Sequence, residues 1–458
     1  LKTATGLSIR NAGDISPIGP YLASTGGASW NSSSRLLMTP FFFWYNMRTG
    51  LHMTSTKGLD ALTNHPVSII TPPFSYASTA WWKKELLDVS SSGVDIILPV
   101  YWGFPDPTGR LNDWNYGGIM TLVQALREMD VANSAHPKVG MFYDTSTLEF
   151  NPLHRKLDLR SDTDRDYFYR TIRDYFSMIP PAHRANIDGK PIVVLYAAVF
   201  AAGINQGAIT YVQDHFQTDF GTRLYIIKNN DWSVSTDSTT AWGAAVSGIT
   251  MNDTVQIGSG YDQSALVNNG DRGPLQVSRE NGDFYMRNWL QAIATGKNKI
   301  IVETWNELHE GSDIAESKEF GRKYIDLTRT YSNLWRQPIS SRQALIEYLY
   351  QCVLKRPSDP GGLQYYLAMQ NGTSFLELFS AFYNSQEFAN KQMSNEQYAT
   401  SLYACVLGRS PDAAGLTSWV QQLSSGTERS SALGQFLQSA EFVSQRGSVL
   451  GASTGFSI

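Results

Sequence analysis

Short apolar runs alternate with amphipathic helical stretches from about residue 36 to residue 335. The apolar runs are rich in Ile, Val, Phe and Tyr and mostly lack strict alternation, which is typical of strands buried on both faces. We predict eight strands, at Leu36–Tyr45, Val67–Ile70, Val94–Tyr101, Lys138–Asp144, Pro191–Ala197, Arg223–Asn229, Thr254–Gly258 and Lys299–Thr304. Helices are predicted between them at Ala80–Val89, Ile119–Met129, Asp166–Met178, Ala208–Phe216 and Phe284–Thr295.

Eight strand-plus-helix units within about 300 residues is the number found in a (β/α)8 barrel. An open doubly wound sheet is the alternative, but no glycine-rich phosphate-binding fingerprint follows the first strand. The predicted fold class is therefore α/β, a (β/α)8 TIM-type barrel over residues 36–335. Residues 1–35 are predicted to be an N-terminal extension packed on the barrel.

The chain after about residue 340 contains an internal repeat with a displacement of 53 residues. The run Leu349-Tyr350-x-Cys352-Val353-Leu354-x-Arg356 recurs as Leu402-Tyr403-x-Cys405-Val406-Leu407-x-Arg409. Asp359 and Gly362 recur as Asp412 and Gly415, and Ser385-x-Glu387-Phe388 recurs as Ser439-x-Glu441-Phe442. A period near 50 residues with helical apolar spacing indicates a duplicated helical unit. We therefore predict a small all-α, two-copy repeat module at residues 340–458.

The repeat resembles the bacterial domain-of-unknown-function family 4214, and the second copy, from Tyr403 to Trp419, fits its pattern closely. Within each copy, an Arg three residues before an Asp is expected to tie a tight turn between helices, and the following Gly to relieve that turn. Cys352 and Cys405 occupy equivalent apolar positions and are expected to be two buried thiols. A disulfide is the alternative if the duplication places them face to face.

Composition excludes several classes of protein. Charged residues are 17 % of the chain and the net charge is −4, so the broad basic field of a nucleic-acid-binding protein is missing. No uninterrupted apolar run is long enough for a membrane span. Aromatic residues reach 12 %, which favours a sugar ligand among the remaining enzymes and binding proteins. Few cysteines and charges, with many Ser, Thr, Asn and Gly, fit a secreted or cell-surface bacterial protein.

Polar residues crowd together where the last predicted strand ends, in Trp305-Asn306-Glu307-Leu308-His309-Glu310-Gly311. Catalytic groups of barrels lie at the C-terminal ends of the strands. Glycoside cleavage usually needs two carboxylates, one to protonate the leaving oxygen and one to act as base or nucleophile. Glu307 and Glu310 are the predicted pair, Trp305 a platform beneath a sugar ring, and Asn306 and His309 ligands of sugar hydroxyls.

Two other interpretations of this segment are open. Asn-Glu-x-x-Glu recurs by chance, and one carboxylate could simply favour the start of a helix. His309-Glu310 also suggests zinc, but Gly311-Ser312-Asp313 follows, so no second His falls on the next helical turn. The remaining histidines are scattered singly, at His52, His65, His136, His154, His183 and His215. We therefore predict no metal and no cofactor, and a metal-dependent hydrolase is disfavoured.

Residues 36–330 resemble the glycoside hydrolase family 99 and family 71 group, especially bacterial family 99-like proteins. The resemblance is carried by the aromatic first strand Phe41–Tyr45, by the strand Val94–Tyr101 with Trp102-Gly103 after it, and by Trp305–Gly311. It implies that Glu307 is a general base acting on the sugar's own 2-hydroxyl and that Glu310 is the general acid/base. It also implies net retention through an anhydro-sugar intermediate.

One departure from that group affects specificity. Family 99 has a Glu-Pro-Tyr sequence at the end of an early strand, where this chain has Tyr143-Asp144-Thr145. A mannose substrate is therefore not implied, and Asp144 is either a ligand of sugar hydroxyls or a helix cap. The full set of predicted substrate-binding residues is Trp44, Tyr45, Tyr101, Trp102, Asp144, Asp231, Tyr261, Trp305, Asn306 and His309.

The predicted function is an endo-acting, retaining glycoside hydrolase that cleaves a polysaccharide or oligosaccharide. The alternative is a non-catalytic carbohydrate-binding or cell-surface protein on the same scaffold, because a fold does not decide function. The helical module is expected to make cell-surface, glycan or protein contacts, or to be purely structural. Nucleic acid is not an expected partner.

Overall fold

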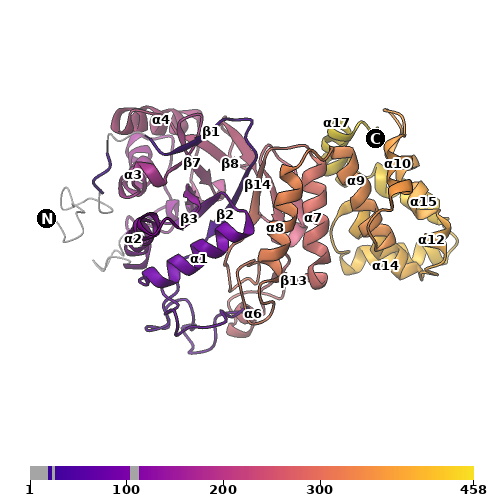
Figure 1. Ribbon diagram of the computed structural model, residues 1–458, viewed down its shortest axis with the longest axis horizontal. Helices are drawn as coiled ribbons and strands as arrows, with labels where there is room; N and C mark the ends of the chain where they lie inside the picture. The colour runs from indigo at the N-terminus through magenta and orange to yellow at the C-terminus, as the bar shows by residue number, and fades with distance from the viewer. Residues whose placement is uncertain (1–18, 23–25, 104–112) are drawn as a thin grey trace.

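The computed structural model describes residues 19–22, 26–103 and 113–458. Figure 1 shows an α/β part on one side and a cluster of helices, formed by the end of the chain, on the other. Within the predicted N-terminal extension, residues 1–18 and 23–25 lie outside the described residues. Its remainder packs on the α/β part, because β1 (Ala28–Trp30) pairs in parallel with β6 (Ala185–Ile187).

Among the described residues, twelve strands join in one sheet. Its parallel ladder consists of β2 (Leu36–Phe41), β3 (Ile96–Tyr101), β5 (Met141–Tyr143), β7 (Lys190–Leu195), β8 (Tyr225–Asn229), β9 (Ser238–Thr240), β11 (Val255–Gly258) and β14 (Lys299–Glu303). They pair in the order β9-β8-β7-β5-β3-β2-β14-β11, each pair parallel. The short β4 (Lys138–Val139) pairs with β3, and β10 (Ile249–Thr250) pairs antiparallel with β11. The separate hairpin-like pair is β12 (Tyr261–Asp262) with β13 (Gln276–Val277).

The two ends of this parallel ladder, β9 and β11, lie next to each other. The Thr254 amide donates to the Thr239 carbonyl at 2.9 Å, and the hydroxyls of Ser238 and Thr254 lie 2.8 Å apart. The Thr240 hydroxyl donates to the Thr254 carbonyl at 3.1 Å. Hydrogen bonds around Thr254, rather than a strand ladder, therefore connect the two ends. The fold is mixed α/β with a largely parallel sheet, as predicted at this coarse level.

One predicted strand is wrong. Val67–Ile70 is a loop in which Val67 is 51 % and Ile70 70 % exposed. β9 takes part in the parallel ladder in its place, and its sequence Ser-Thr-Thr has no apolar residue by which it could be recognised. The other seven predicted strands overlap β2, β3, β4 with β5, β7, β8, β11 and β14.

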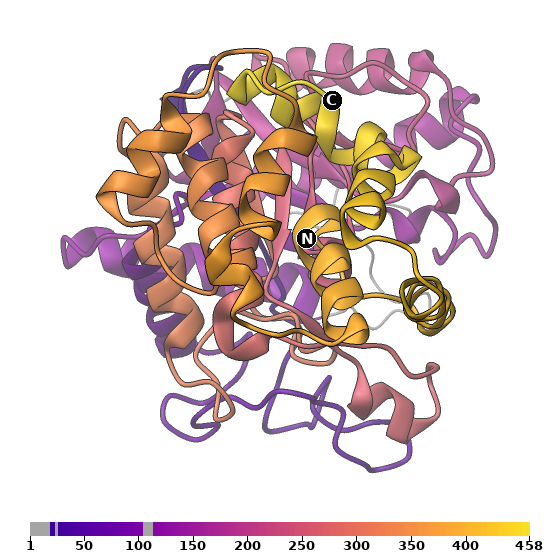
Figure 2. The ribbon, with the colours of Figure 1, turned by 90° about the vertical axis from the view of Figure 1, so that its right-hand side faces the viewer.

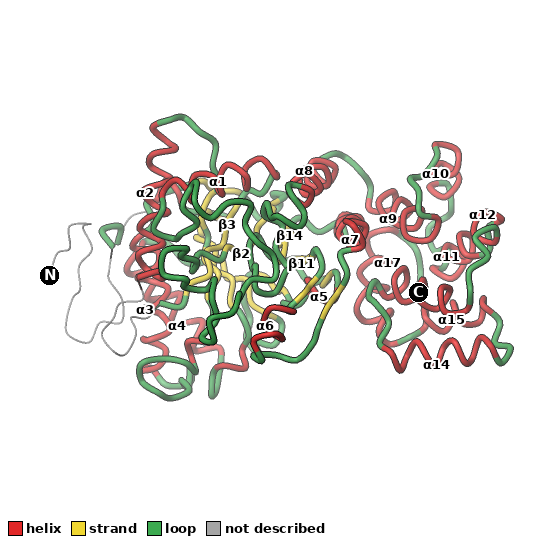
Figure 3. Tube along the Cα trace, turned by 90° about the horizontal axis from the view of Figure 1, so that it is seen from below, coloured by secondary structure: helices red, strands yellow, loops and turns green. Residues whose placement is uncertain are grey.

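Helices lie outside the strands, as Figure 3 shows. They are α1 (Thr79–Ser92), α2 (Gly118–Val131), α3 (Asp162–Met178), α4 (Gln206–Phe220), α5 (Ala244–Ser247), α6 (Ser264–Asn269), α7 (Asp283–Ala294) and α8 (Lys323–Arg336). The predicted helices correspond to α1, α2, α3, α4 and α7. In α1, Ser78 caps the first turn, Gly93 ends the helix at φ 85°, and Trp82 stacks on Phe41 of β2 at 5.0 Å. Within the described residues, no helix is both long enough and apolar enough to cross a membrane.

The rest of the chain is helical. Its elements are α9 (Ser341–Leu349), η6 (Tyr350–Leu354), α10 (Pro360–Leu367), α11 (Phe375–Tyr383), α12 (Gln386–Ala389), α13 (Asn395–Leu402), η7 (Tyr403–Leu407), α14 (Ala413–Ser424), α15 (Arg429–Gln438), α16 (Ala440–Phe442), η8 (Val443–Gly447) and α17 (Ser448–Thr454). In Figure 2 these helices face the viewer, in front of the α/β part. They pack on it through α7, which contacts α9 and α17, and the Ser453 hydroxyl donates to the Ala294 carbonyl at 2.6 Å.

The spacing that both copies share has a structural reason beyond the predicted turn. The Arg356 guanidinium binds both carboxylate oxygens of Glu387 at 2.8 Å, and its contact with Asp359 is longer, at 3.2 Å. Arg409 binds Glu441 in the same bidentate manner. Each copy therefore joins its turn to the Ser-x-Glu-Phe helix through a forked ion pair, a geometry that the guanidinium favours.

Two expectations about the repeat are corrected. Gly362 lies in the first turn of α10 and donates to the capping Asp359 carboxylate at 2.8 Å, and a Cβ there would collide with the Tyr350 hydroxyl. The glycine therefore leaves room for a tyrosine rather than relieving a turn. Cys352 and Cys405 are not free thiols, because they form a disulfide between the two copies, with their Cα atoms 5.7 Å apart.

Candidate active site

The chain turns back on itself after β14, beside the C-terminal end of β2. The Trp305 amide donates to the Pro40 carbonyl of β2 at 3.0 Å. The Ile314 amide then donates to the Trp305 carbonyl at 2.9 Å, which closes the loop. Glu307, His309 and Glu310 lie within this loop, so they are held at the strand ends by backbone hydrogen bonds.

Glu307 forms a buried ion pair with His309. One carboxylate oxygen, Oε1, accepts from the His309 amide at 3.1 Å and lies 2.7 Å from Nδ1. The other ring nitrogen, Nε2, lies 2.9 Å from the His52 carbonyl, which can only accept a proton. Burial lowers the pKa of His309, but the charge and hydrogen bond of Glu307 outweigh it and the pKa is raised. The ring is therefore an imidazolium that fixes one oxygen of Glu307.

Glu310 is the second acid of the loop and is partly exposed. Burial raises its pKa, the negative charge of Glu307 raises it further, and the guanidinium of Arg272 opposes both. Arg272 forms an ion pair with Glu310 and also donates to the Tyr261 hydroxyl at 3.2 Å. Glu310 thus has the raised pKa that a proton donor needs, and the neighbouring Arg272 cation limits the rise.

Glu303, the last residue of β14, is a third and fully buried acid close to this pair. Its Oε2 accepts from the backbone amides of Gly243 at 3.0 Å and Ala244 at 2.9 Å. Burial raises its pKa to about 7, these amides oppose the rise, and the charge of Glu310 adds to it. Glu303 therefore connects the end of β14 to the segment after β9.

We expect Glu303→Gln to remove part of the pH dependence of stability. The pKa of Glu303 in the folded protein, about 7, lies above its ordinary 4.5. The folded state therefore holds this proton more tightly than the unfolded chain. The stabilisation is complete below pH ~4.5 and is lost as the pH rises through ~7, on the order of 3 kcal/mol in all.

Urea unfolding of wild type and variant at pH 5 and pH 7 measures this effect. The free energy of unfolding should fall less in the variant, by about 2 kcal/mol, over this interval. Because the buried acids away from this site titrate equally in both proteins, the difference reports Glu303 together with its coupling to Glu310. Equal falls in the two proteins would contradict the assignment.

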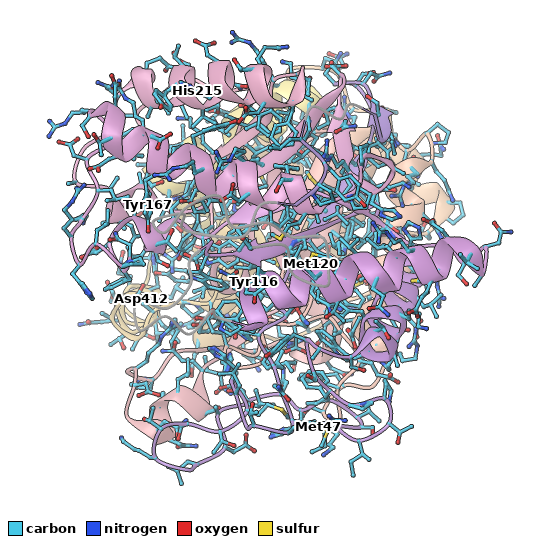
Figure 4. The ribbon with its side chains drawn as sticks, turned by 90° about the vertical axis from the view of Figure 1, so that its left-hand side faces the viewer. Met47, Tyr116, Met120, Tyr167, His215 and Asp412 are labelled. Atoms are coloured by element: carbon cyan, nitrogen blue, oxygen red, sulfur yellow. A yellow bond between two sulfur atoms is a disulfide. The ribbon has the colours of Figure 1, made fainter. Side chains whose placement is uncertain are left out.

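Half-buried aromatic rings gather beside the carboxylates. Trp44, in the loop after β2, stacks on the His52 ring at 4.3 Å and on Trp102 at 5.1 Å. Trp102 meets Trp114 edge to face at 5.1 Å. Trp114 belongs to η1 (Asp113–Gly117), whose Tyr116 is labelled in Figure 4. Trp44 also contacts the His309 ring at 5.4 Å, so the aromatic cluster adjoins the Glu307–His309 pair.

Tyr196 is another residue close to these acids. It follows β7, is half-buried, and packs against Trp242 at 5.5 Å. Burial raises its pKa to about 12, and the charges of Asp144, Glu310 and Glu303 add to this rise. Its hydroxyl therefore lies within electrostatic reach of three acids from the ends of two strands, β5 and β14.

Two predicted substrate ligands next to Glu307 are corrected. Trp305 has no exposed surface, and its indole N–H donates to the Glu85 carboxylate of α1 at 2.8 Å. Asn306 is buried and exchanges two hydrogen bonds of 2.8 Å with the backbone of Phe42. Both side chains hold the loop against the core and present no surface to a ligand.

Tyr45 and Tyr101 are corrected for the same reason, since neither has exposed surface. The Tyr45 hydroxyl donates to the Asn306 carbonyl at 2.9 Å and accepts from the Leu308 amide at 3.1 Å. The Tyr101 ring packs against Tyr175. Tyr45 therefore supports the loop, and Tyr101 belongs to the core.

Of the remaining predicted ligands, some lie at the site and others hold the loops around it. Asp144 caps η2 (Thr145–Leu148) by accepting from the Ser146 amide at 3.0 Å, and burial raises its pKa. Asp231 is exposed and accepts from the Ala198 amide at 2.8 Å, which joins two loops. Tyr261 lies beside Glu310 and Arg272, and burial raises its pKa. The residues brought together are therefore Glu307, Glu310, His309, Trp44, Trp102 and Tyr261, with the charge of Asp144 reaching Tyr196.

Arg272, Tyr196, Trp114 and Glu303 were not predicted. Arg272 lies in a loop and Trp114 in η1, both far from the carboxylates in sequence, so no local pattern indicates them. Glu303 and Tyr196 did carry a signal, since each is a polar residue at a strand end. Among the described residues, one group of three His, Cys, Asp or Glu side chains has possible metal-ligand atoms that all lie within 4.8 Å of one another. It consists of Asp130, His136 and His183.

This chain is similar to several solved structures at low sequence identity. No curated protein sequence matches it. A glycoside hydrolase family 99 endo-α-mannosidase from Bacteroides thetaiotaomicron is similar in structure, with 15 % identity over 66 % of this chain and 98 % of that one, at a TM-score of 0.47. A glycoside hydrolase-like protein shares 13 % identity over 68 % and 98 %, at 0.48. An amylase, AmyB from Thermotoga neapolitana, shares 9 % over 67 % and 78 %, at 0.34. Likenesses of this size carry no argument about activity.

Family models match both parts of the chain. The domain of unknown function DUF4214 matches residues 312–392 and 379–446, which confirms the resemblance drawn from the repeat. The domain of unknown function DUF5010 matches residues 33–344, more than half of the chain. This match covers the parallel sheet and the loop that carries Glu307 and Glu310. The chain therefore belongs to the DUF5010 family.

Proposed function

We propose that the protein is a glycoside hydrolase acting on a polysaccharide and that its α/β part is a (β/α)8 barrel. The barrel is supported by the pairing of β14 with β2 and by the hydrogen bonds of Thr254 across the β9–β11 junction. The observation that carries the activity is the pair Glu307 and Glu310 at the end of β14, where burial and a neighbouring carboxylate raise the pKa of one member.

Glu310 is the proposed general acid/base. A carboxyl whose pKa is raised holds its proton closer to neutral pH and can deliver it to the departing glycosidic oxygen. After departure, the carboxylate recovers the proton from the attacking water. Its partial exposure, with 20 % of the side chain accessible, gives a substrate access to this group.

Glu307 is the proposed base. The His309 imidazolium fixes Oε1, and no described residue forms a hydrogen bond with Oε2, which is the oxygen offered to substrate. By the family 99-like resemblance, this oxygen accepts the proton of the sugar's own 2-hydroxyl, and the anomeric configuration is retained. Trp44, Trp102 and Trp114 are the proposed ring-stacking surface for the sugar.

We expect Arg272→Gln to move the alkaline limb of the pH–rate profile to higher pH by about one unit. Arg272 lowers the pKa of Glu310, so its removal raises that pKa and keeps the acid protonated to higher pH. The measurement is kcat/KM against pH on a cleaved glycan. Arg329→Gln is the control, because Arg329 pairs with Asp326 on α8. An unchanged limb, or a move to lower pH, would contradict the assignment.

A non-catalytic glycan-binding protein is the second candidate, and one observation favours it. The ion pair with Arg272 stabilises the ionised form of Glu310, which cannot donate a proton. Both candidates bind sugar at the aromatic cluster, but only the first cleaves it.

A panel of microbial and plant polysaccharides separates the two candidates. Affinity electrophoresis measures binding of the full chain, and the release of reducing ends measures cleavage. The glycosidase binds and releases reducing ends from at least one glycan. Binding without release supports the second candidate, and neither binding nor release contradicts both.

We propose further that the protein is exported, to the cell surface or the medium. The Cys352–Cys405 disulfide supports this, since disulfides persist mainly in oxidising compartments. The proposed division is an extension at residues 1–35, a barrel at 36–335 and a helical module at 340–458 that contacts the cell surface or glycan.

A further inference from the structure

Three side chains meet at the edge of the sheet opposite to the carboxylate pair. Asp130 is near the end of α2, His136 precedes β4, and His183 ends η3 (Pro181–His183) just before β6. The start of β4 lies at the N-terminal end of the parallel ladder, whereas Glu307 follows the C-terminal end of β14. The sequence separates these residues by up to 53 positions, so they were predicted to be scattered.

One carboxylate holds both histidines. His136 Nε2 lies 2.8 Å from Asp130 Oδ1, and His183 Nε2 lies 2.7 Å from Asp130 Oδ2. Both rings are buried, with 6 % and 3 % of their side chains exposed, while the Asp130 side chain is 51 % exposed. The cluster is therefore closed on the histidine side and open to solvent on the carboxylate side.

The tautomer of His136 is set by its backbone neighbour. His136 Nδ1 lies 3.0 Å from the Pro137 carbonyl, which can only accept, so Nδ1 carries a proton. In the neutral ring the lone pair of Nε2 then points at the Asp130 carboxylate, so either a proton on Nε2 or a metal ion lies between these two electron-rich atoms. An Nδ1–H bound to a backbone carbonyl is the usual outer contact of a histidine that ligates metal through Nε2.

We propose that Asp130, His136 and His183 bind a divalent transition metal ion, with Zn²⁺ as the preferred one. Two imidazoles and a carboxylate are ligands that Zn²⁺ accepts in tetrahedral sites, with water in the fourth position. Metal–ligand bonds of about 2.0–2.1 Å place neighbouring ligand atoms about 3.3 Å apart. The ligand atoms already lie within 4.8 Å of one another, so small side-chain rotations admit the ion.

The ion would link two segments of the α/β part, each of which connects a helix to the next strand. His136 belongs to the segment between α2 and β4, and His183 to the segment between α3 and β6. Asp130 connects them through its two oxygens, and the two histidine rings contact each other edge to face at 5.5 Å. A bound ion would tie both segments to the end of α2, and it would raise the Tm in proportion to its occupancy. The proposed role is structural and independent of the proposed hydrolysis.

The test is titration of the EDTA-treated full chain with Zn²⁺ by calorimetry and with Co²⁺ by visible absorption. We expect one equivalent of Zn²⁺, a rise in Tm, and absorption bands of Co²⁺ bound by nitrogen and oxygen ligands. His136→Gln should weaken Zn²⁺ binding by at least about 100-fold. Asp130→Asn is the second variant, because the side chain of Asp130 is half exposed and the amide keeps its size.

His215→Gln is the matched control. His215 lies on α4, where Figure 4 labels it, and its Nδ1 contacts the Tyr211 carbonyl of the same helix. This variant should bind Zn²⁺ as the wild type does. The proposal is overturned if wild type takes up no Zn²⁺, if Co²⁺ gives only the spectrum of the hydrated ion, or if Asp130→Asn and His215→Gln bind equally. In any of these outcomes, the cluster is a hydrogen-bonded charge group only.

Discussion

Replacing Glu310 by glutamine is expected to lower kcat on a cleaved glycan by about 10²–10⁴-fold, the usual contribution of a general acid/base. The amide keeps the size of the side chain but holds no proton of suitable acidity for the leaving oxygen. Binding should be retained, because the aromatic cluster and the Glu307–His309 pair are unchanged. The measurement is release of reducing ends, with affinity electrophoresis of the same glycan in parallel.

Glu319→Gln is the control for this variant. Glu319 belongs to the segment that follows the same strand, and it pairs with His65 at 2.8 Å rather than with the carboxylates. Its loss should leave kcat unchanged within about twofold, as expected for a partly exposed pair. If Glu310→Gln retains the activity of this control, Glu310 is not the acid.

Removing the disulfide is expected to lower the free energy of unfolding by about 4 kcal/mol, because it closes a long loop in the unfolded chain. The two cysteines are separated by 53 residues and join equivalent positions in the two repeat copies. Cys352→Ser with Cys405→Ser removes the cross-link and keeps both side chains small. Urea unfolding followed by tryptophan fluorescence and circular dichroism measures the loss.

Reduction provides the internal control for that measurement. Dithiothreitol should destabilise the wild type to about the level of the double variant and leave the variant itself unchanged. Equal stability of wild type and variant under oxidising conditions would show that the cross-link does not contribute. A transition in two steps would show that the helical module unfolds separately from the rest.

Much of the fold could be predicted because it depends on local patterns. The strands with long apolar runs, such as β3 and β14, are buried on both faces, and the sequence shows this directly. β9 could not be predicted, since Ser238, Thr239 and Thr240 gain their place through hydrogen bonds to Thr254 rather than through apolar burial. Val67–Ile70 shows the reverse error, an apolar run that remains exposed.

The active site at Glu307 and Glu310 stays a prediction, and the structure corrects several of the contacts expected around it. The motif around Glu307 indicates where polar groups lie along the chain, but not which way each side chain points. Trp305 turns into the core toward Glu85, and Asn306 turns toward Phe42, because the loop after β14 must satisfy its own polar groups. Arg272 reaches Glu310 from 38 residues away, and only the folded chain shows that contact.

The disulfide and the histidine cluster could not be predicted from the sequence, for the same reason. Two apolar cysteines 53 residues apart are compatible with thiols or a disulfide until the packing of the copies is known. His136 and His183 are single histidines in sequence and meet only because two connections end at the same edge of the sheet. Non-local contacts of this kind depend on topology, which local periodicity does not specify.

Time-resolved ¹H NMR shows whether Glu307 and Glu310 cleave a glycosidic bond. The full chain is mixed with each glycan that it binds, and the anomeric signals are followed from the first minutes. We expect new reducing-end signals that appear first in the configuration of the cleaved linkage, and none with Glu310→Gln. An anomeric region that stays unchanged while the glycan is bound would contradict it.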